Sequence, residues 1–364
     1  MTPLDRLYMD RAYELAARGV GNTAPNPPVG SVIVRDGRII GEGYHHRAGL
    51  PHAEANALAQ AGDARGATVY VTLEPCNHVG RTPACSHALV AAGVARVVIG
   101  TVDPNPKTNG GGIATLRDAG IDVEVLAETR AARLIERFAF SIAHDLPYLA
   151  LKMAMSLDGR ITSRPGVQEW ITSEEERLYV RDLRVAYDAV MVGAGTVRVD
   201  DPQLTVRPPS HRLRPYTRVV ACETAAVPPT RRVFASVTDY AKTIVLAPGG
   251  ARSEFADLEG VAEVVFVGSA DARVLDLTEA LRALRARGIQ SVLCEGGPTL
   301  GARLLAARVV NRIYWAIAPV LLTTPDAVPV LAGADLATLG IRVRFDGVEM
   351  VGGDVVVTAE VQDV

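Results

Sequence analysis

The stretch that decides the fold of the first half of the chain reads His52-Ala53-Glu54, then Glu74-Pro75-Cys76, then Cys85 after eight further residues. One imidazole and two thiolates form a three-ligand set for Zn²⁺ and leave the fourth coordination position open for water, as a catalytic site requires. Glu54 lies two residues after the histidine, which places it beside the metal and not on it. There it can take a proton from the activated water and pass it to a leaving group.

This pattern matches a wider signature only in part. The signature H-x-E…P-C-x-x-C is typical of zinc deaminases, which attack the amino-bearing carbon of a pyrimidine or purine. Eight residues separate Cys76 from Cys85 here, where that signature has two. Each residue taken alone has a simpler explanation. His52 could be an ordinary surface or core histidine, and Cys85 could be an inert buried thiol. The order of the residues, with Glu54 in place, favours catalytic zinc.

Length and composition bound the class of protein. A chain of 364 residues is too long for one ordinary core, so two domains are expected. A net charge of −3 gives no footprint for nucleic acid or for an anionic membrane surface. Charged residues at positions 5–11 argue against a signal peptide or a membrane span. Cys222 and Cys294 stand far apart, which favours a reducing compartment and so the cytoplasm.

Apolar spacing and turn signals predict alternating strands and helices in the first half. This alternation implies a three-layer α/β sandwich with some parallel strands. Residues 144–147 end the last predicted helix of this half. We therefore place the domain boundary there, with domains at 1–146 and 147–364. The expected helices are 4–18, 52–61, 82–92, 112–119 and an amphipathic helix at 128–143; the expected strands are 31–34, 38–44, 67–73, 96–100 and 121–125.

Two polar segments of the first half allow two interpretations each. Asn26 stands in a proline-clamped loop, where its amide suits the polar edge of a heterocycle or satisfies its own turn. His78, Arg81 and Thr82 lie between the two cysteines. They are donors suited to a phosphate or sugar, or they belong to a solvated loop.

The second half also reads as α/β. Capping boxes are expected at Ser173/Glu176 and Asp276/Glu279. The expected strands are 148–154, 189–192, 218–221, 243–246 and 291–294, with helices at 173–186 and 276–288 and antiparallel strands at 313–322, 342–347 and 355–361.

Three features of this half suggest a site. Lys152 interrupts a buried strand, so it must snorkel or face a site. The run 193–198 is half of a dinucleotide fingerprint, which is weak evidence because the third glycine is missing. Residues 295–298, Glu-Gly-Gly-Pro, form either a phosphate-binding helix start or a plain turn.

Longer motifs resemble the deaminase half of the bifunctional riboflavin-biosynthesis deaminase/reductase family. They are Pro25-Asn26-Pro27-x-Val29-Gly30, Gly43-Tyr44-His45, Pro51-His52-Ala53-Glu54, the run from Glu74 to Cys85, and Asp103-Pro104-Asn105-Pro106. The eight-residue spacing is normal in that family. The resemblance implies a cytidine-deaminase-like domain in which His52, Cys76 and Cys85 bind zinc and Glu54 shuttles protons. It also implies that Asn26, His45 and His78 face the substrate pyrimidine and its ribose phosphate.

The resemblance continues into the reductase half, which implies a dihydrofolate-reductase-like fold. It is carried by Lys152-x-Ala154-x-Ser156-Leu157-Asp158-Gly159-Arg160, Trp170-Ile171-Thr172, Gly193-x-Gly195-Thr196-Val197, the run from Asp200 to Arg207, and Glu295-Gly296-Gly297-Pro298-Thr299-Leu300. The resemblance implies NADPH near Ala154, Trp170, Thr196, Asp200, Gly296 and Gly297. It implies substrate near Lys152, Gln168, Arg184, Leu204, Arg207 and Glu295. Arginine forks suit a ribose phosphate.

Three positions depart from the family pattern. Gln168 stands where many members have Ser, Cys222 where many have Asp, and Asn311-Arg312 where an Asp-Glu pair is usual. We expect the last two to affect packing or a ribose contact. Gln168 is bulkier than Ser, so it bears on how substrate sits and on the rate of reduction.

The expected function is a cytoplasmic zinc-dependent deaminase and NADPH-dependent reductase of riboflavin precursors. Its expected ligand is a small pyrimidine ribose-phosphate, with neither nucleic acid nor membrane as partner. The family implies a homo-oligomer, a dimer or tetramer. The first alternative is a nucleic-acid or cytidine deaminase. The second is a zinc deaminase whose second domain only senses nucleotide, for which Gln168 is the support. Structural zinc in a binding module is disfavoured by the incomplete ligand set.

Overall fold

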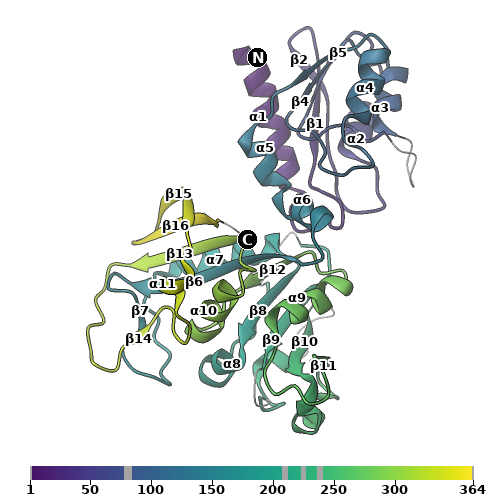
Figure 1. Ribbon diagram of the computed structural model, residues 1–364. Helices are drawn as coiled ribbons and strands as arrows, with labels where there is room; N and C mark the ends of the chain where they lie inside the picture. Colours follow the sequence, from purple (N-terminus) through teal and green to yellow (C-terminus); the bar gives the residue numbers. More distant parts are fainter. Residues whose placement is uncertain (1, 78–83, 207–211, 223–226, 236–240, 363–364) are drawn as a thin grey trace. The chain divides into compact units, whose positions relative to one another are not determined.

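The computed structural model describes residues 2–77, 84–206, 212–222, 227–235 and 241–362. The chain forms two compact units, residues 1–144 and 145–364 (Figure 1). Among the helices of the described ranges, none combines the length and the apolar character that crossing a membrane demands.

The first unit contains a five-stranded sheet in the order β2-β1-β3-β4-β5. The first three strands in this order pair antiparallel, and β3, β4 and β5 run parallel. The positive φ angles of Asp36 and Gly37 make the tight turn between β1 and β2. The strands are β1 Gly30–Arg35, β2 Arg38–Tyr44, β3 Thr68–Val71, β4 Arg96–Ile99 and β5 Asp122–Val125.

Helices cover both faces of this sheet, as the expected three-layer sandwich requires (Figure 1). Alternate residues of each strand feed the two cores: Ile33 packs toward α2, α3 and α4, while Val32 packs toward α1 and α5. One expectation was wrong. The helix expected at 128–143 is two helices, because Ile135 leaves helical dihedrals and buries its side chain. The helices are α1 Pro3–Ala17, α2 Ala53–Ala61, α3 Cys85–Ala91, α4 Gly111–Asp118, α5 Thr129–Leu134 and α6 Glu136–Ala143.

The second unit is built on a nine-stranded sheet in the order β11-β10-β9-β8-β12-β6-β13-β16-β15. The first seven strands in this order are parallel, and β16 and β15 add an antiparallel hairpin. The strand expected at 313–322 therefore pairs parallel with β6 on one side and antiparallel only with β16. The strands are β6 Tyr148–Ser156, β8 Ala189–Gly193, β9 Tyr216–Ala221, β10 Ala241–Pro248, β11 Glu263–Val267, β12 Ser291–Cys294, β13 Arg312–Ala318, β15 Val343–Val351 and β16 Asp354–Val361.

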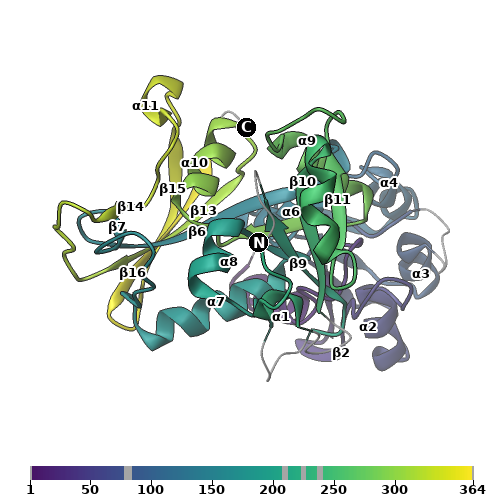
Figure 2. The same ribbon diagram turned by 90° about the horizontal axis from the view of Figure 1, so that it is seen from below.

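The helices of this unit lie on opposite faces of the sheet: Figure 2 shows α9 and α10 on one side and α7 and α8 on the other. Seven short elements of the described ranges are not predicted from the sequence: α8, β7, β11, β14, α11 and the 3₁₀ segments η1 and η2. The remaining bounds are β7 Arg160–Thr162, α7 Glu174–Ala186, α8 Ala194–Asp200, η1 Arg232–Phe234, η2 Gly249–Leu258, α9 Leu277–Ala286, α10 Pro298–Ala306, β14 Val328–Pro329 and α11 Leu336–Leu339.

Two of these helices begin at the caps expected from the sequence. The side chains of Ser173 and Asp276 accept hydrogen bonds from the amides of Glu176 and Glu279. The Glu176 side chain does not complete a capping box. Its carboxylate accepts a hydrogen bond from Thr172 Oγ1 and pairs with Lys152 instead.

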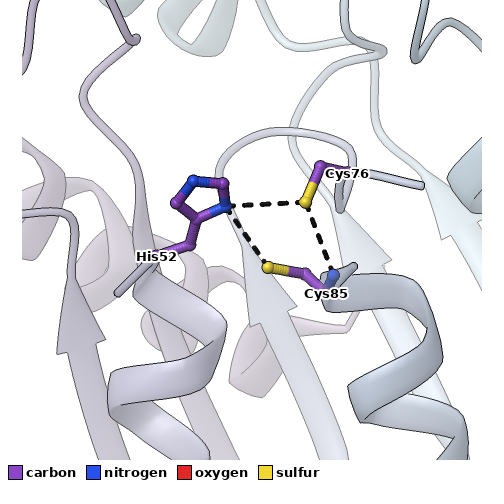
Figure 3. Close-up of side chains that lie close together, drawn as sticks. All are labelled: His52, Cys76 and Cys85. Carbon is purple, nitrogen blue, oxygen red and sulfur yellow. Dashed lines mark hydrogen bonds between the residues drawn. The ribbon is translucent and has the colours of Figure 1, made fainter. Parts of the chain in front are cut away.

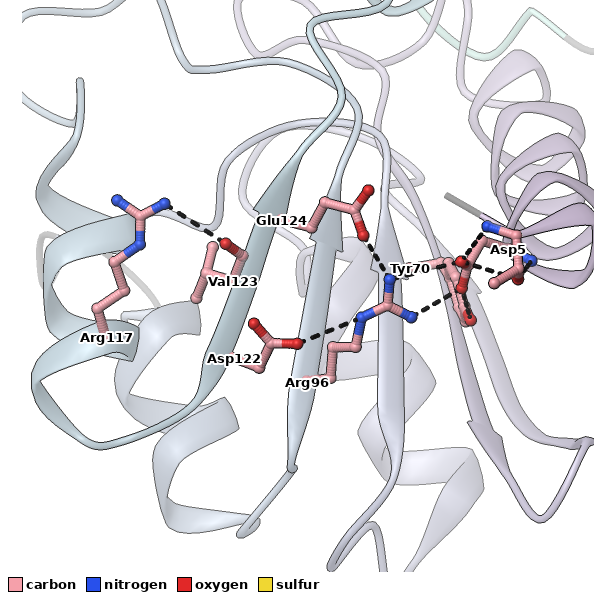
Figure 4. Close-up of polar contacts among 8 residues, drawn as sticks. Asp5, Tyr70, Arg96, Arg117, Asp122, Val123 and Glu124 are labelled. Atoms are coloured by element: carbon pink, nitrogen blue, oxygen red, sulfur yellow. Dashed lines mark hydrogen bonds and ion pairs between the residues drawn. The ribbon is translucent and has the colours of Figure 1, made fainter.

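A partly buried ion pair ties the first helix to the sheet of the first unit (Figure 4). The Asp5 carboxylate of α1 accepts hydrogen bonds from Tyr70 Oη on β3, at 2.7 Å, and from Arg96 Nη1 on β4, at 2.8 Å. Arg96 also pairs with Glu124 on β5. The Arg96 guanidinium holds the pKa of Asp5 well below its usual range. The folded unit is thereby stabilised by the charged form of this carboxyl.

We expect Asp5→Asn to destabilise the first unit by about 3 kcal/mol, because it leaves the buried side of Arg96 without its carboxylate. The pKa of Asp5 is lowered on folding, so this stabilisation is present above about pH 4 and falls as the pH drops below it. Urea unfolding of the full chain, followed by circular dichroism at one pH above about 4 and one below it, measures the effect.

The matched control is Asp10→Asn on the same helix. Asp10 pairs with Arg130 at 2.8 Å, but both side chains are about half exposed. Such a pair contributes about 0–1 kcal/mol. Equal unfolding free energies for the two variants would contradict the role given to Asp5.

Candidate metal centre and pocket

The three residues of the expected zinc set lie together at one end of the first sheet (Figure 3). His52 caps the start of α2, Cys76 lies beyond β3, and Cys85 is the first residue of α3. His52 Nδ1 is 3.5 Å from Cys76 Sγ and 3.4 Å from Cys85 Sγ. All three atoms lie within 4.8 Å of one another.

This geometry fits Zn²⁺. Bond lengths of about 2.0 Å to nitrogen and about 2.3 Å to sulfur, at a tetrahedral angle, put the two ligand atoms about 3.5 Å apart. The observed nitrogen–sulfur distances agree with that value. One imidazole and two thiolates are also the kind of ligand set that leaves a fourth position for water.

The thiols of the set are electrostatically linked. Hydrogen bonds from Cys85 and from His52 lower the pKa of Cys76 to about 4. The Cys76 thiolate in turn raises the pKa of Cys85, and its hydrogen bond raises the pKa of His52. The pair of sulfurs thus keeps one proton between them. A metal must displace protons from these ligands, so its binding weakens as the pH falls.

Glu54 lies in the first turn of α2, where it is 3% exposed. Burial raises the pKa of Glu54 to about 7, and the nearby Cys76 thiolate adds to the effect. A carboxyl group with a pKa near neutrality can both accept and return a proton at working pH. The geometry therefore suits Glu54 to proton transfer beside the metal centre.

Asn26 and His45 are brought next to the metal ligands. The two rings of His45 and His52 meet edge to face with centroids 5.1 Å apart. His45 Nδ1 lies 3.1 Å from the carbonyl of Pro51, so this nitrogen carries the proton and Nε2 accepts from the Asn26 amide, also at 3.1 Å. Burial lowers the pKa of His45, which keeps it neutral. His78, Arg81 and Thr82 lie outside the described residues.

A residue that the sequence analysis gave no role supports this centre. Glu74 precedes Pro75-Cys76 and is 3% exposed. Its carboxylate accepts hydrogen bonds from the backbone amides of Asp103, Gly110, Gly112 and Ile113 at 3.0–3.2 Å. The segment carrying Cys76 is thereby fixed to the start of α4. The available signal was a carboxylate directly before Pro-Cys at the end of a buried strand.

The second unit contains a cavity of about 770 Å³ beyond the carboxyl ends of β6, β8 and β12. This is where ligands bind in open α/β sheets. Its lining includes every described residue that we expected near NADPH or substrate in this half: Lys152, Ala154, Gln168, Trp170, Arg184, Thr196, Asp200, Leu204, Glu295, Gly296 and Gly297. Arg207 lies outside the described residues.

Two ion pairs lie in this pocket. Arg184 Nε and Nη2 bind the Glu295 carboxylate at 2.6 and 2.7 Å, and its Nη1 donates to the carbonyl of Thr205. Burial alone lowers the pKa of Arg184, but the Glu295 carboxylate outweighs it and raises the pKa. The guanidinium fork expected for a phosphate is thus engaged by Glu295. Lys152 Nζ lies 2.8 Å from Glu176 Oε1.

The three departures from the family pattern fall in different places. Cys222 is fully buried, and burial raises the pKa of its thiol to about 12. Asn311 Oδ1 accepts from the amide of Leu149, and Arg312 is largely buried. Neither position belongs to the pocket lining. Gln168 does, and its side chain is exposed.

The fold and the two sites define a class of protein. It joins a zinc-dependent deaminase domain to an α/β domain whose pocket has the size and position of a nucleotide site. Sequence comparison agrees in both halves. Residues 3–101 match the cytidine and deoxycytidylate deaminase zinc-binding region, and residues 147–357 match the RibD C-terminal domain.

Relatives cover almost the whole chain. The riboflavin biosynthesis protein RibD of Aquifex aeolicus is 40% identical, over 97% of this chain and 98% of its own. The Acinetobacter baumannii RibD structure covers 99% of both chains at 36% identity, with a TM-score of 0.84. A Thermotoga maritima deaminase/reductase structure covers 98% of both at 35% identity, with a TM-score of 0.85. The chain belongs to the RibD family, which confirms the resemblance and the fold class.

We expect the purified protein to bind one Zn²⁺ per chain and Cys85→Ala to weaken that binding by more than about 100-fold, beyond what loss of a supporting residue costs. Lowering the pH from about 7 to about 5 should weaken it further, since protons compete for the sulfurs. Competition with a coloured chelator measures both effects.

Cys294→Ala is the control, because Cys294 is also a buried free cysteine but belongs to the second unit. Its zinc content should equal that of the wild type. Full zinc affinity in Cys85→Ala would refute the ligand assignment.

Proposed function

We propose that this chain is a bifunctional enzyme of riboflavin biosynthesis. Its first domain, residues 1–146, removes an amino group from diaminohydroxyphosphoribosylaminopyrimidine as ammonia. Its second domain, residues 147–364, reduces the product, 5-amino-6-(5-phosphoribosylamino)uracil, with NADPH. The observation that carries the proposal is near-complete coverage by RibD relatives together with a His/Cys/Cys cluster of zinc dimensions. The Thermotoga maritima protein is described as having both activities.

In the deaminase step, His52, Cys76 and Cys85 would hold a Zn²⁺ ion, which when bound would supply an acidified water for attack on the amino-bearing carbon. Glu54 takes the proton from this water and returns it to the departing amine, so that ammonia leaves and a carbonyl remains. The pKa of Glu54 near 7 supports both transfers. Asn26 and neutral His45 orient the pyrimidine beside the metal, with His78 toward the ribose phosphate.

In the reductase step, NADPH bound in the second-unit pocket would supply the hydride that converts the ribosyl group to a ribityl chain. The chain's residues bind and orient the two reactants. Gly296, Gly297 and the first residues of α10 line the pocket, and a helix start of this kind suits a phosphate of the cofactor. Ala154, Trp170, Thr196 and Asp200 complete the proposed cofactor side. Lys152, Gln168, Arg184, Leu204, Arg207 and Glu295 make up the proposed substrate side.

Association between copies of this chain is supported by one surface. The edge strand β15 exposes Phe345, Val348 and Met350, each by about two thirds or more. Such an apolar edge invites pairing with another sheet. We therefore include a homo-oligomer, a dimer or tetramer, in the proposal. The described cysteines are all free thiols, which supports a place in the cytoplasm.

We expect Glu54→Gln to lower ammonia release by at least about 10³-fold, because the amide cannot take up the proton. NADPH oxidation should persist when the deaminated uracil is supplied directly, which controls for correct folding. Ammonia and NADPH absorbance are followed in parallel. Rapid ammonia release by Glu54→Gln, or none by the zinc-loaded wild type, would refute the proposed chemistry.

NADPH oxidation by the wild type separates a working reductase from a nucleotide sensor, and replacing Gln168 tests whether this departure from the family pattern matters. Its side chain is exposed at the pocket rim, so it can swing aside at little cost. We expect wild type to oxidise NADPH with the uracil substrate, and Gln168→Ser to change kcat/KM by no more than about threefold, as for other surface changes. Binding of NADPH without oxidation would favour the sensor.

A further inference from the structure

Glu176 forms an ion pair with the ammonium group of Lys152 in the second-unit pocket. Its Oε1 lies 2.8 Å from Lys152 Nζ, and the two side chains are 1% and 12% exposed. Lys152 projects from β6 on the face opposite Leu151 and Met153, which belong to the main core. Both residues line the cavity. A charged pair this well buried requires precise geometry to exist at all.

The carboxylate of Glu176 is itself held in place. Its Oε2 accepts a hydrogen bond from Thr172 Oγ1 at 2.9 Å, while among the described residues the buried Oε1 has only the ion pair with Lys152 as its contact and no hydrogen bond of regular geometry. Its backbone amide donates to Ser173 Oγ, which fixes the first turn of α7. Ser173 in turn binds Asp354 Oδ2 through its amide and hydroxyl, at 2.7 and 2.6 Å. Glu176 is thus anchored from the hairpin of β15 and β16.

The lysine depends on this anchor. A lysine side chain has four rotatable bonds and no geometry of its own, so a single buried acceptor decides where its ammonium points. The ammonium has three N–H donors and Glu176 engages one side of it. Donors remain for an oxygen atom of a ligand in the cavity. The neighbouring Arg184 is already engaged by Glu295 and Thr205.

We infer that Glu176 is a positioning residue for the reductase step: it fixes the Lys152 ammonium where it meets an oxygen of the ribosyl group. The inference rests on the proposed function, in which Lys152 contacts substrate. Glu176 itself touches neither hydride donor nor reacting carbon. It acts through Lys152 alone, and this distinguishes it from a charge pair that only stabilises the fold.

The test is a double-mutant comparison in the full-length protein. Glu176→Gln keeps the size of the side chain and removes its charge. Misplacement of a substrate-orienting group costs about 100-fold, so kcat for NADPH oxidation with the uracil substrate should fall by about that factor. NADPH affinity, measured by its fluorescence, should change less than about threefold. Ammonia release by the first unit, in the same preparations, normalises the amount of protein, and the NADPH affinity reports on the fold of the second unit.

Three control variants test whether Glu176 acts on kcat through Lys152. In a Lys152→Met background, Glu176→Gln should change kcat by less than about threefold, because nothing remains to position. Glu174→Gln lies in the same first turn of α7 but is exposed, and it should match wild type. Glu176→Asp keeps the charge at a shorter reach, and it should recover part of the lost kcat even if Glu176→Gln folds poorly.

The outcomes that overturn the inference are distinct from failure of the proposed function. Wild-type kcat in Glu176→Gln refutes the inference alone. So does an equal loss in the wild-type and Lys152→Met backgrounds, since that loss would be structural. A wild-type protein that oxidises no NADPH with the uracil substrate overturns the proposed reductase, and the inference falls with it.

Discussion

A carboxylate taken out of water must be given a partner, and this constraint organises both units. In the first unit, Asp5 is paired with Arg96, and Glu74 is satisfied by four backbone amides. In the second, Glu176 is paired with Lys152 and Glu295 with Arg184. Each partnership joins segments distant in the chain. The buried acids therefore fix the fold and, except for Asp5, do so at the edge of a site.

Glu54 is the informative exception. It is as buried as Asp5, yet among the described residues it forms no ion pair with an arginine or lysine. Its pKa is raised, whereas that of Asp5 is lowered. A structural acid is stabilised by its cation at all times. An acid that must exchange a proton has to remain near the point where both forms are populated. The same burial thus serves stability at Asp5 and chemistry at Glu54, and the difference is the partner.

Sequence spacing was enough for the zinc set but not for the ion pairs. His52 precedes α2, Cys76 follows β3 and Cys85 starts α3, and these element ends meet at one end of the sheet. The local sequence pattern was therefore enough to predict that the three residues lie close together. Arg184 and Glu295 are 111 residues apart, and their bidentate contact depends on the end of α7 lying near the segment that follows β12. Neighbouring-strand order is equally non-local, which is why β13 was expected to be antiparallel and is parallel to β6. Glu176 seemed to be only a capping residue because its amide does serve the cap.

The paired charges change how the second-unit pocket can bind a phosphate-bearing ligand. A free arginine fork would attract a phosphate by charge, but Arg184 with Glu295 and Lys152 with Glu176 are two neutral units. These pairs then contribute to binding by orienting a ligand more than by attracting it through net charge, since each offers hydrogen-bond donors at fixed positions on rigid elements. In the proposed reductase, charge attraction for a phosphate is then left to other cations of the lining, such as Arg177 and Arg181. We therefore propose that orientation and attraction fall to different residues, so that the reacting carbon is placed independently of the phosphate that holds the molecule.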